Sequence, residues 1–238
     1  MIRTVPETGS TNADLLAAAR AGEAAEGHWL VADRQTAGRG RQGRSWFDGE
    51  GNFMGSTVVH LREPDPPAAT LSFVAGLAAY EAVRPFVPGP VLLELKWPND
   101  LLLAGGKVNG VLLERAGDAV VVGIGVNLAQ APALPDRRTA AIADHAPAPG
   151  RDLFAQTLAG SFADELERWR FYGLAPLLKR WTSAAHPEGT RMTVNPPGEG
   201  PVDGSYAGLT KDGALRLRLP DGTVRAIHAG DVMLSGEG

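Results

Sequence analysis

The stretch QTAGRGRQGRSWF, residues 35–47, places three glycines and three arginines side by side and ends on two aromatic residues. The spacing Gly38-x-Gly40-x-x-Gly43 is that of a dinucleotide-binding loop. Such a loop opens a helix at its third glycine, whereas here the polar, glycine-rich sequence RSWFDGEGN follows. An arginine–glycine segment that binds nucleic acid would be longer, repeated and set in a basic chain. The pattern therefore favours neither of these two classes of binding loop.

Two interpretations of residues 35–47 remain, a solvated loop and a loop that folds around an anion. Glycine lets the backbone approach a ligand closely, and arginine presents fixed donors for carboxylate and phosphate groups. Trp46 and Phe47 are placed to close over an apolar or planar group. We expect such a loop to be mobile until its ligand arrives, because it has little to bury on its own.

The composition is that of an ordinary globular protein. The 238 residues are 44% hydrophobic and 21% charged, which suits one full domain and a smaller second one. A formal net charge of -4 does not favour DNA or an anionic membrane as partner. The absence of cysteine excludes disulfides, thiolate catalysis and sulfur metal sites. The first residues contain no apolar signal segment, and no apolar run reaches membrane-spanning length, so we expect a cytoplasmic protein.

Apolar periodicity and turn residues predict alternating helices and strands in the first three quarters of the chain. The predicted helices span residues 10–22, 71–86, 151–173 and 175–186. The predicted strands span residues 28–35, 52–61, 90–97, 100–103, 108–114 and 119–128. The last three of these strands are joined by short glycine-containing turns and form an antiparallel meander.

The pattern changes at about residue 187, which predicts a domain boundary there. Short apolar segments at 190–195, 202–209, 214–219 and 223–234 are separated by turns such as KDG and PDG. We expect these segments to form a small all-β barrel.

Lys96 ends an apolar run in LELKWPND, directly before Trp97 and Pro98. A buried ammonium is costly unless an anion meets it. One interpretation is that Lys96 meets an anionic substrate at the end of a strand, held there by the Pro98 turn. The other is that it reaches solvent or pairs with Asp100. Lys107 is either a second cation for phosphate or a turn residue.

Gly123 and Gly125 in VVGIGVN lie two residues apart and therefore on one face of a strand. Two missing side chains leave either a flat slot for a ligand or room for close helix–sheet packing. Asn127 follows, with an amide suited to the edge of a heterocycle. The STN sequence at residues 10–12 either caps a helix or holds polar ligand groups at its N-terminus. Together these features indicate a small ligand with an apolar part and at least two anionic groups, and they identify no metal ligands.

The segments STN, QTAGRGRQGRSW, KWPNDLLLAGGKVNGVLLE and GIGVNL resemble those of biotin–protein ligases in order and spacing. The resemblance is dense over residues 10–128 and looser through GLAPLLKRW and the β-rich tail. It implies an α+β fold with a mixed, mostly antiparallel sheet and helices, as in class II synthetases. It also implies a biotin- and ATP-binding catalytic domain at residues 1–186 and a small SH3-like β-barrel domain at 187–238.

The resemblance further implies substrates, partners and roles. Biotin and ATP are the substrates, Mg²⁺ accompanies the nucleotide, and a lysine of a biotin carboxyl carrier domain accepts the biotin. The protein is expected to be a monomer or homodimer without DNA or membrane partners. Lys96 and Arg41 are implied to be catalytic. The residues implied to bind biotin are Ser10, Thr11, Asn12, Gln35, Gly38, Arg39, Gly40, Arg41, Trp46, Lys96, Gly110, Gly123 and Gly125. Those implied to bind ATP or the adenylate are Arg41, Arg44, Lys107 and Asn127.

Three departures from the family pattern stand out. Asn109 replaces a small apolar residue and raises the expectation of added polarity beside the slot. FDGEGNFM matches the family's usual segment only loosely. The STN motif lies so near the start that we expect the form without an N-terminal DNA-binding domain. The alternatives are a lipoate–protein ligase, whose usual glycine-rich run with a following His-Asp is absent, and a non-catalytic biotin-binding module.

Overall fold

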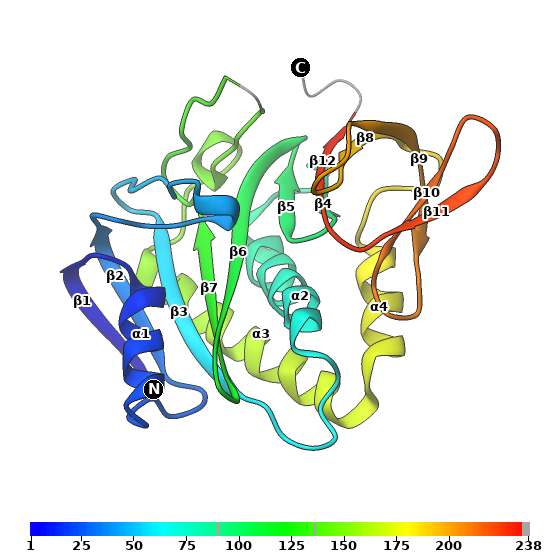
Figure 1. The fold of residues 1–238 in the computed structure, drawn as a ribbon. Helices are drawn as coiled ribbons and strands as arrows, with labels where there is room; N and C mark the ends of the chain where they lie inside the picture. The colour runs from blue at the N-terminus through cyan, green and yellow to red at the C-terminus, as the bar shows by residue number, and fades with distance from the viewer. Residues whose placement is uncertain (90, 136, 235–238) are drawn as a thin grey trace.

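A seven-stranded mixed sheet organises the larger part of the molecule (Figure 1). The computed structural model describes residues 1–89, 91–135 and 137–234. The strand order is β1-β2-β3-β7-β6-β5-β4; β1 and β2 are parallel, and every other neighbouring pair is antiparallel. The strands are β1 (Ile2–Thr8), β2 (Trp29–Gln35), β3 (Phe53–His60), β4 (Leu93–Lys96), β5 (Asp100–Leu103), β6 (Gly106–Ala116) and β7 (Ala119–Val126). The predicted mixed, mostly antiparallel sheet is confirmed, and so is the antiparallel meander of β5, β6 and β7.

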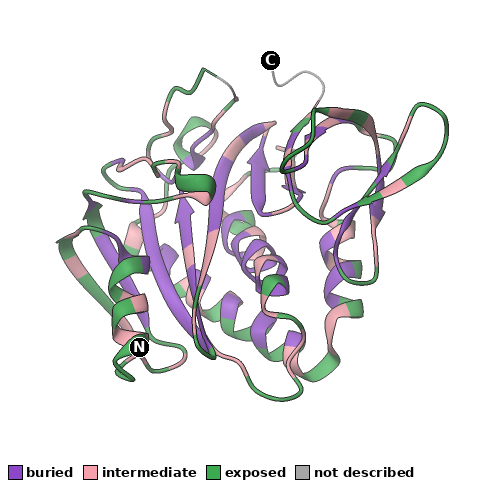
Figure 2. Cartoon of the chain, viewed as in Figure 1, coloured by how far each residue is buried: buried purple, intermediate pink, exposed green. Residues whose placement is uncertain are grey.

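Helices cover both faces of this sheet. Helix α1 (Thr11–Arg20) lies on one face, where Leu15 and Leu16 pack on a small apolar cluster of β3 and β7. Helices α2 (Leu71–Val83) and α3 (Arg151–Tyr172) lie on the other face, and α4 (Leu174–Ser183) follows. Figure 2 shows that α2 and the central strands are almost entirely buried. All four helices agree with the predictions, although α2 ends before Pro85, whose ring and missing N–H do not fit the helix interior. Within the described ranges, no helix is long and apolar enough to cross a membrane.

Residues 191–234 form a second, five-stranded antiparallel sheet in the order β11-β10-β9-β8-β12. Its strands are β8 (Arg191–Asn195), β9 (Val202–Leu209), β10 (Leu215–Arg218), β11 (Val224–Ile227) and β12 (Asp231–Leu234). The segment predicted at 223–234 is two strands rather than one, because the chain turns at Gly230 (φ 156°). This sheet shares one continuous apolar core with the larger part. At the junction, Trp97 Nε1 donates to the Gly213 carbonyl at 3.1 Å.

Strand register brings the glycines of β6 and β7 to the α1 face of the large sheet. Gly123 is paired with Ser56 on β3 and with Leu112 on β6. Gly125, two residues further along β7, is paired with Met54 and Gly110. Paired residues of antiparallel strands share a face. Two successive rows on this face therefore have a glycine at their centre on β7, and the second row has another glycine, Gly110, beside it on β6.

Candidate functional site

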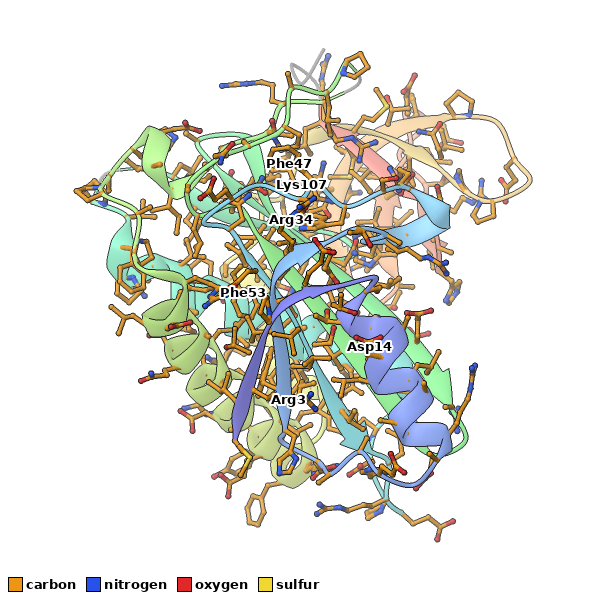
Figure 3. The ribbon with its side chains drawn as sticks, turned by 90° about the vertical axis from the view of Figure 1, so that its left-hand side faces the viewer. Arg3, Asp14, Arg34, Phe47, Phe53 and Lys107 are labelled. Atoms are coloured by element: carbon orange, nitrogen blue, oxygen red, sulfur yellow. The ribbon has the colours of Figure 1, made fainter. Side chains whose placement is uncertain are left out.

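A cavity of about 940 Å³ opens on the α1 face of the large sheet, beside the second sheet. In Figure 3 the labelled Phe47 and Lys107, which both line it, lie at the end of the sheet where it opens, whereas Arg3 lies at the opposite end. The predicted site residues that line the cavity are Ser10, Thr11, Asn12, Gln35, Arg39, Gly40, Arg41, Arg44, Trp46, Lys96, Lys107, Gly110, Gly123, Gly125 and Asn127. Gly38 is not among the lining residues; a Cβ there would lie 3.3 Å from Gln35 Nε2.

The polar end of the cavity is the N-terminus of α1. Ser10 is the N-cap, and its hydroxyl accepts from Ala13 N at 3.4 Å. Thr11 N donates to Gln35 Oε1 at 2.7 Å, and Asn12 Oδ1 accepts from the Ser56 hydroxyl at 2.7 Å. The predicted cap is therefore confirmed, and the STN side chains also line the cavity; their contact with polar ligand groups stays a prediction.

The glycines of β6 and β7 make room for protein side chains. A Cβ at Gly123 would lie 2.2 Å from Asn12 Oδ1. A Cβ at Gly125 would lie 2.2 Å from Trp46 Cε2, and one at Gly110 would lie 2.7 Å from Trp46 Cζ3. The expected flat slot against bare backbone is thus modified: the indole of Trp46 lies over Gly110 and Gly125 and forms an apolar wall.

The Gly/Arg loop, residues 38–46, is folded on itself and touches the rest of the protein. Trp46 N donates to the Gly38 carbonyl at 3.0 Å, which closes the loop. Arg41 Nη1 donates to Asn99 Oδ1 at 2.9 Å, and Arg44 Nη2 donates to both carboxylate oxygens of Asp231 at 3.0 Å. Most of the loop is exposed or half-buried, although these hydrogen bonds connect it to the rest of the protein, and its mobility without ligand stays a prediction.

Two lysines and one aspartate form a buried charge cluster at the cavity wall. Lys96 is only 6% exposed, and its Nζ lies 3.8 Å from Asp100 Oδ2. Lys107 Nζ donates to Asp100 Oδ1 at 2.5 Å. Burial alone raises the pKa of Asp100, but the charges of Lys107 and Lys96 outweigh it and hold that pKa below its usual value. The predicted pairing of Lys96 with Asp100 is confirmed. Lys96 also lines the cavity, and its contact with an anionic substrate stays a prediction.

Two buried asparagines behave differently. Asn127 lines the cavity; its Nδ2 donates to the Ala140 carbonyl at 3.1 Å, and its buried Oδ1 has no hydrogen-bond partner among the described residues. It offers an acceptor to a ligand. Asn109 is paired with Val126 of the main core, on the opposite face, and its Nδ2 donates to the Gly125 carbonyl at 3.0 Å. Asn109 is therefore not among the lining residues of the cavity, and its amide hydrogen-bonds the backbone of β7 instead.

Several lining residues were missed by sequence reasoning. Ser56 was missed although the period of two along β3 puts it on one face, because the pairing with Gly123 is visible only in the fold. The connection after β7 and strand β12 also contribute, and neither carries a sequence signal of binding. The lining residues that they add are Pro132, Leu134, Pro135, Arg137, Thr139, Asp231, Val232 and Met233. Lys96 Nζ donates to the Val232 carbonyl at 3.2 Å, so the second sheet completes the site.

The charges of the cavity favour an anionic ligand. Positive side chains of the Gly/Arg loop and the strand ends outnumber the two carboxylates among the described lining residues, Asp100 and Asp231. Each of these carboxylates is already engaged, with lysines or with Arg44. Among residues 1–89, 91–135 and 137–234, no three His, Asp or Glu side chains lie together as a metal site.

Comparisons with known proteins agree with this geometry. The model of the biotin/lipoate A/B protein ligase family matches residues 5–128, and that of the biotin protein ligase C-terminal domain matches residues 190–235. A biotin–[acetyl-CoA-carboxylase] ligase of Paracoccus denitrificans is 39% identical over 96% of this chain and 98% of its own length. The bifunctional ligase/repressor BirA of Escherichia coli is 32% identical over 98% of this chain and 74% of its own length.

The comparison with solved structures also finds biotin protein ligases. The biotin protein ligase of Aquifex aeolicus in complex with biotin and ATP has a TM-score of 0.84 and 28% identity, covering 98% of this chain and 97% of its own. The Leishmania major biotin protein ligase in complex with biotinyl-5-AMP has a TM-score of 0.66 and 26% identity, covering 96% of this chain and 98% of its own. On these matches, the chain belongs to the biotin/lipoate A/B protein ligase family, among its biotin protein ligases.

Proposed function

We propose that this protein is an ATP-dependent biotin–protein ligase, which activates biotin as biotinyl-5′-AMP and transfers it to a lysine of a carrier domain. The observation that supports this best is the order of groups along one cavity. Polar side chains at the start of α1 come first, the indole wall over Gly125 comes next, and Asn127 follows directly after the end of β7. A urea ring, an aliphatic tail and a nucleotide in succession match that order.

In this proposal the urea of biotin meets the polar end of the cavity and its tail follows the glycine rows. Thr11, Asn12 and Gln35 supply hydrogen bonds to the urea, and Trp46 packs on the apolar tail. The biotin carboxylate then meets Lys96, which is already buried and held in place by Asp100 and the Val232 carbonyl. An ammonium that is fixed before the ligand arrives loses little on binding it.

The nucleotide occupies the other end of the cavity in the same proposal. The free Oδ1 of Asn127 accepts from the amino group of adenine. Arg41, Arg44 and Lys107 meet the phosphates. The two carboxylates among the described lining residues are engaged with cations, so Mg²⁺ would be held by the phosphates and would supply further neutralisation of their charge.

The reaction has two half-reactions. A biotin carboxylate oxygen attacks the α-phosphorus of ATP, forming biotinyl-5′-AMP and releasing pyrophosphate. A lysine amine of the acceptor then attacks the acyl carbon, forming an amide, losing its proton and releasing AMP. Two anions must meet in the first step, so Lys96 and Arg41 act by neutralising charge and holding both groups in place. The Gly/Arg loop keeps water away from the mixed anhydride.

We infer that the acceptor is the biotin carboxyl carrier domain of a carboxylase, as the name of the Paracoccus relative suggests. The net charge of -4 supports a protein acceptor rather than DNA as partner, and we propose a monomer or homodimer. We also propose a catalytic domain at residues 1–186 and a C-terminal domain at 187–238.

Mass spectrometry of the acyl-adenylate tests this function. The protein is incubated with ATP and either biotin or lipoate, and we expect biotinyl-5′-AMP in the first case only. Lipoyl-AMP as the main product would instead identify a lipoate–protein ligase. Binding of biotin without either adenylate would identify a non-catalytic binding module.

A further inference from the structure

We propose that Glu114, which does not line the cavity, is a positioning residue that fixes which groups at the polar end donate and which accept hydrogen bonds. The inference rests on the proposed function, because the ligand concerned is the urea ring of biotin. Glu114 lies on β6, half-buried, and its Oε2 accepts from Asn12 Nδ2 at 2.8 Å. From Asn12 a chain of short hydrogen bonds leads to the residues that meet the urea.

The first link sets the orientation of the Asn12 amide. An ionised carboxylate only accepts hydrogen bonds, so the NH₂ group of Asn12 must face Glu114. Its Oδ1 is then turned toward Ser56, whose Oγ lies 2.7 Å away. Because Asn12 Oδ1 has no proton to give, the single hydroxyl proton of Ser56 is committed to this contact.

The second link follows from counting protons. The hydroxyls of Ser56 and Thr11 lie 2.7 Å apart, a distance that requires a proton between them. Since the proton of Ser56 is committed to Asn12, this proton belongs to Thr11. The 3.1 Å contact from Thr11 Oγ1 to Gln35 Oε1 is then the weaker arm of the same donor. The two lone pairs of Thr11 Oγ1 are left to accept from a ligand.

Gln35 completes the pattern with a donor. Its Oε1 accepts from the backbone N–H of Thr11 at 2.7 Å, so its NH₂ group is turned the other way. The polar end of the cavity therefore presents an acceptor at Thr11 and a donor at Gln35. A cyclic urea has ring N–H donors and one carbonyl acceptor, which is the complementary set.

Replacing Glu114 by glutamine breaks this arrangement without changing its shape. A glutamine NH₂ group can donate to Asn12 Oδ1, so the Asn12 amide is free to turn over and donate to Ser56. Ser56 then donates to Thr11 and occupies one of the two lone pairs of Thr11 Oγ1, which weakens this oxygen as an acceptor for the urea. One neutral hydrogen bond corresponds to roughly five- to tenfold in affinity. Glu114→Gln should raise the KM for biotin by about that factor and leave kcat and the KM for ATP unchanged, because Glu114 touches none of the phosphate-binding cations.

The test measures pyrophosphate release in the full-length protein with each substrate varied in turn. The variants are Glu114→Gln, Ser56→Ala and their combination, with Glu199→Gln as control, since Glu199 pairs with Arg225 at the surface of the second sheet. Both single variants should raise the biotin KM, and the combined variant should be no worse than Ser56→Ala, because Ser56 connects Asn12 to Thr11. The control should match the wild type.

The results that would overturn the inference are distinct from a failure of the proposed function. A wild-type biotin KM in Glu114→Gln would show that the carboxylate sets nothing at the urea. A fall in kcat together with similar rises in the KM for biotin and the KM for ATP would show a general disturbance of the site instead of positioning. Should Glu114→Gln fold poorly, Ser56→Ala alone provides the same KM and kcat comparison. Failure of the proposed function is seen in the wild type alone, as absence of biotinyl-5′-AMP.

Discussion

Lys96 is the residue on which adenylate formation is expected to depend most. Lys96→Ala removes the charge that meets the biotin carboxylate and the α-phosphate, while Lys107 still pairs with Asp100 and preserves the wall of the cavity. We expect biotinyl-5′-AMP formation to fall on the order of 100-fold or more, measured by single-turnover mass spectrometry. Lys179→Ala, at an exposed position on α4, is the matched control. Near-normal adenylate synthesis in Lys96→Ala would refute the assigned role.

Gly125 tests whether the wall made by Trp46 is part of the binding site. In Gly125→Ala the new methyl would lie 2.2 Å from Trp46 Cε2, so the indole must move. Overpacking of this kind costs roughly 1–3 kcal/mol, equivalent to a loss of about five- to over a hundredfold in biotin affinity measured by calorimetry. The control is Gly160→Ala, exposed on α3 with open space around it, which should stabilise the helix by about 0.5–1 kcal/mol. Unchanged biotin affinity in Gly125→Ala would place the ligand elsewhere.

Among single residues, the sequence predicts those whose side-chain chemistry is unusual for their position. Lys96 was identified because an ammonium at the end of an apolar run needs an anion, and Gly123 because its spacing from Gly125 clears one strand face. Ser56 and Glu114 carry no such signal, because a serine or glutamate in a strand is ordinary. Their importance comes from strand register, which brings each of them to Asn12.

At the scale of the elements, ion pairs around Glu26 connect α3 to the segments that flank β2 and β3. Glu26, just before β2, accepts from Arg170 Nη1 at 2.6 Å and Nη2 at 2.8 Å, and Arg62 adds a second ion pair. The hydrogen bond from Arg170 lowers the pKa of Glu26 below its usual 4.5 and outweighs the opposing effect of burial. The stability that follows is fully present above the unfolded-state pKa and is lost as pH falls through the folded-state value.

Glu26→Gln should therefore destabilise the protein in a pH-dependent way. Because the carboxylate is partly exposed, we expect a loss of about 1 kcal/mol at neutral pH, measured as the free energy of unfolding in urea. The difference from wild type should shrink as the pH drops through the folded-state pKa of Glu26. The control is Glu23→Gln, an exposed position in the same connection. A constant difference between Glu26→Gln and wild type at every pH would assign the effect to packing.

The elements missed by sequence reasoning share a physical cause. Strand β1, with the sequence IRTVPET, contains Pro6 and has mostly exposed or half-buried side chains, so it shows no clear apolar alternation. Proline is tolerated there because β1 is an edge strand. Its strand conformation depends on parallel pairing with β2, a tertiary contact that local pattern does not report. The long central strands and α2 were predictable because burial on both sides makes them continuously apolar.

At the scale of the whole molecule, the second sheet is part of the site through Asp231. Asp231→Ala frees Arg44 from its partner, so the guanidinium is no longer held at the cavity edge. The pair is partly exposed, which limits the expected effect to a severalfold rise in the KM for ATP. Biotin affinity without ATP should be unchanged, because Asp231 lies away from the polar end at α1. Steady-state kinetics and calorimetry check this, with Asp203→Ala, exposed on β9, as control. A fall in the KM for ATP would show that Asp231 competes with the nucleotide instead of orienting Arg44.

The contacts between the two sheets could be predicted from the sequence only in part. Composition change near residue 187 predicts a β-rich tail, and the second sheet confirms it. The contacts of the tail with the larger part could not be predicted in the same way: β12 contacts Lys96 through the Val232 carbonyl, and Trp97 Nε1 donates to the Gly213 carbonyl. Contacts between residues this far apart leave no trace in local periodicity, and they make point variants more informative than removal of the tail, which would uncover the shared core.

The contribution of β12 also has a consequence for biosynthesis. Ser10 and Val232 line one cavity although most of the chain separates them. A nascent chain on the ribosome can fold α1 and β2 early, but its site stays incomplete until β12 has left the exit tunnel. A frameshift that removes β12 would therefore leave most of the fold in place and the site open.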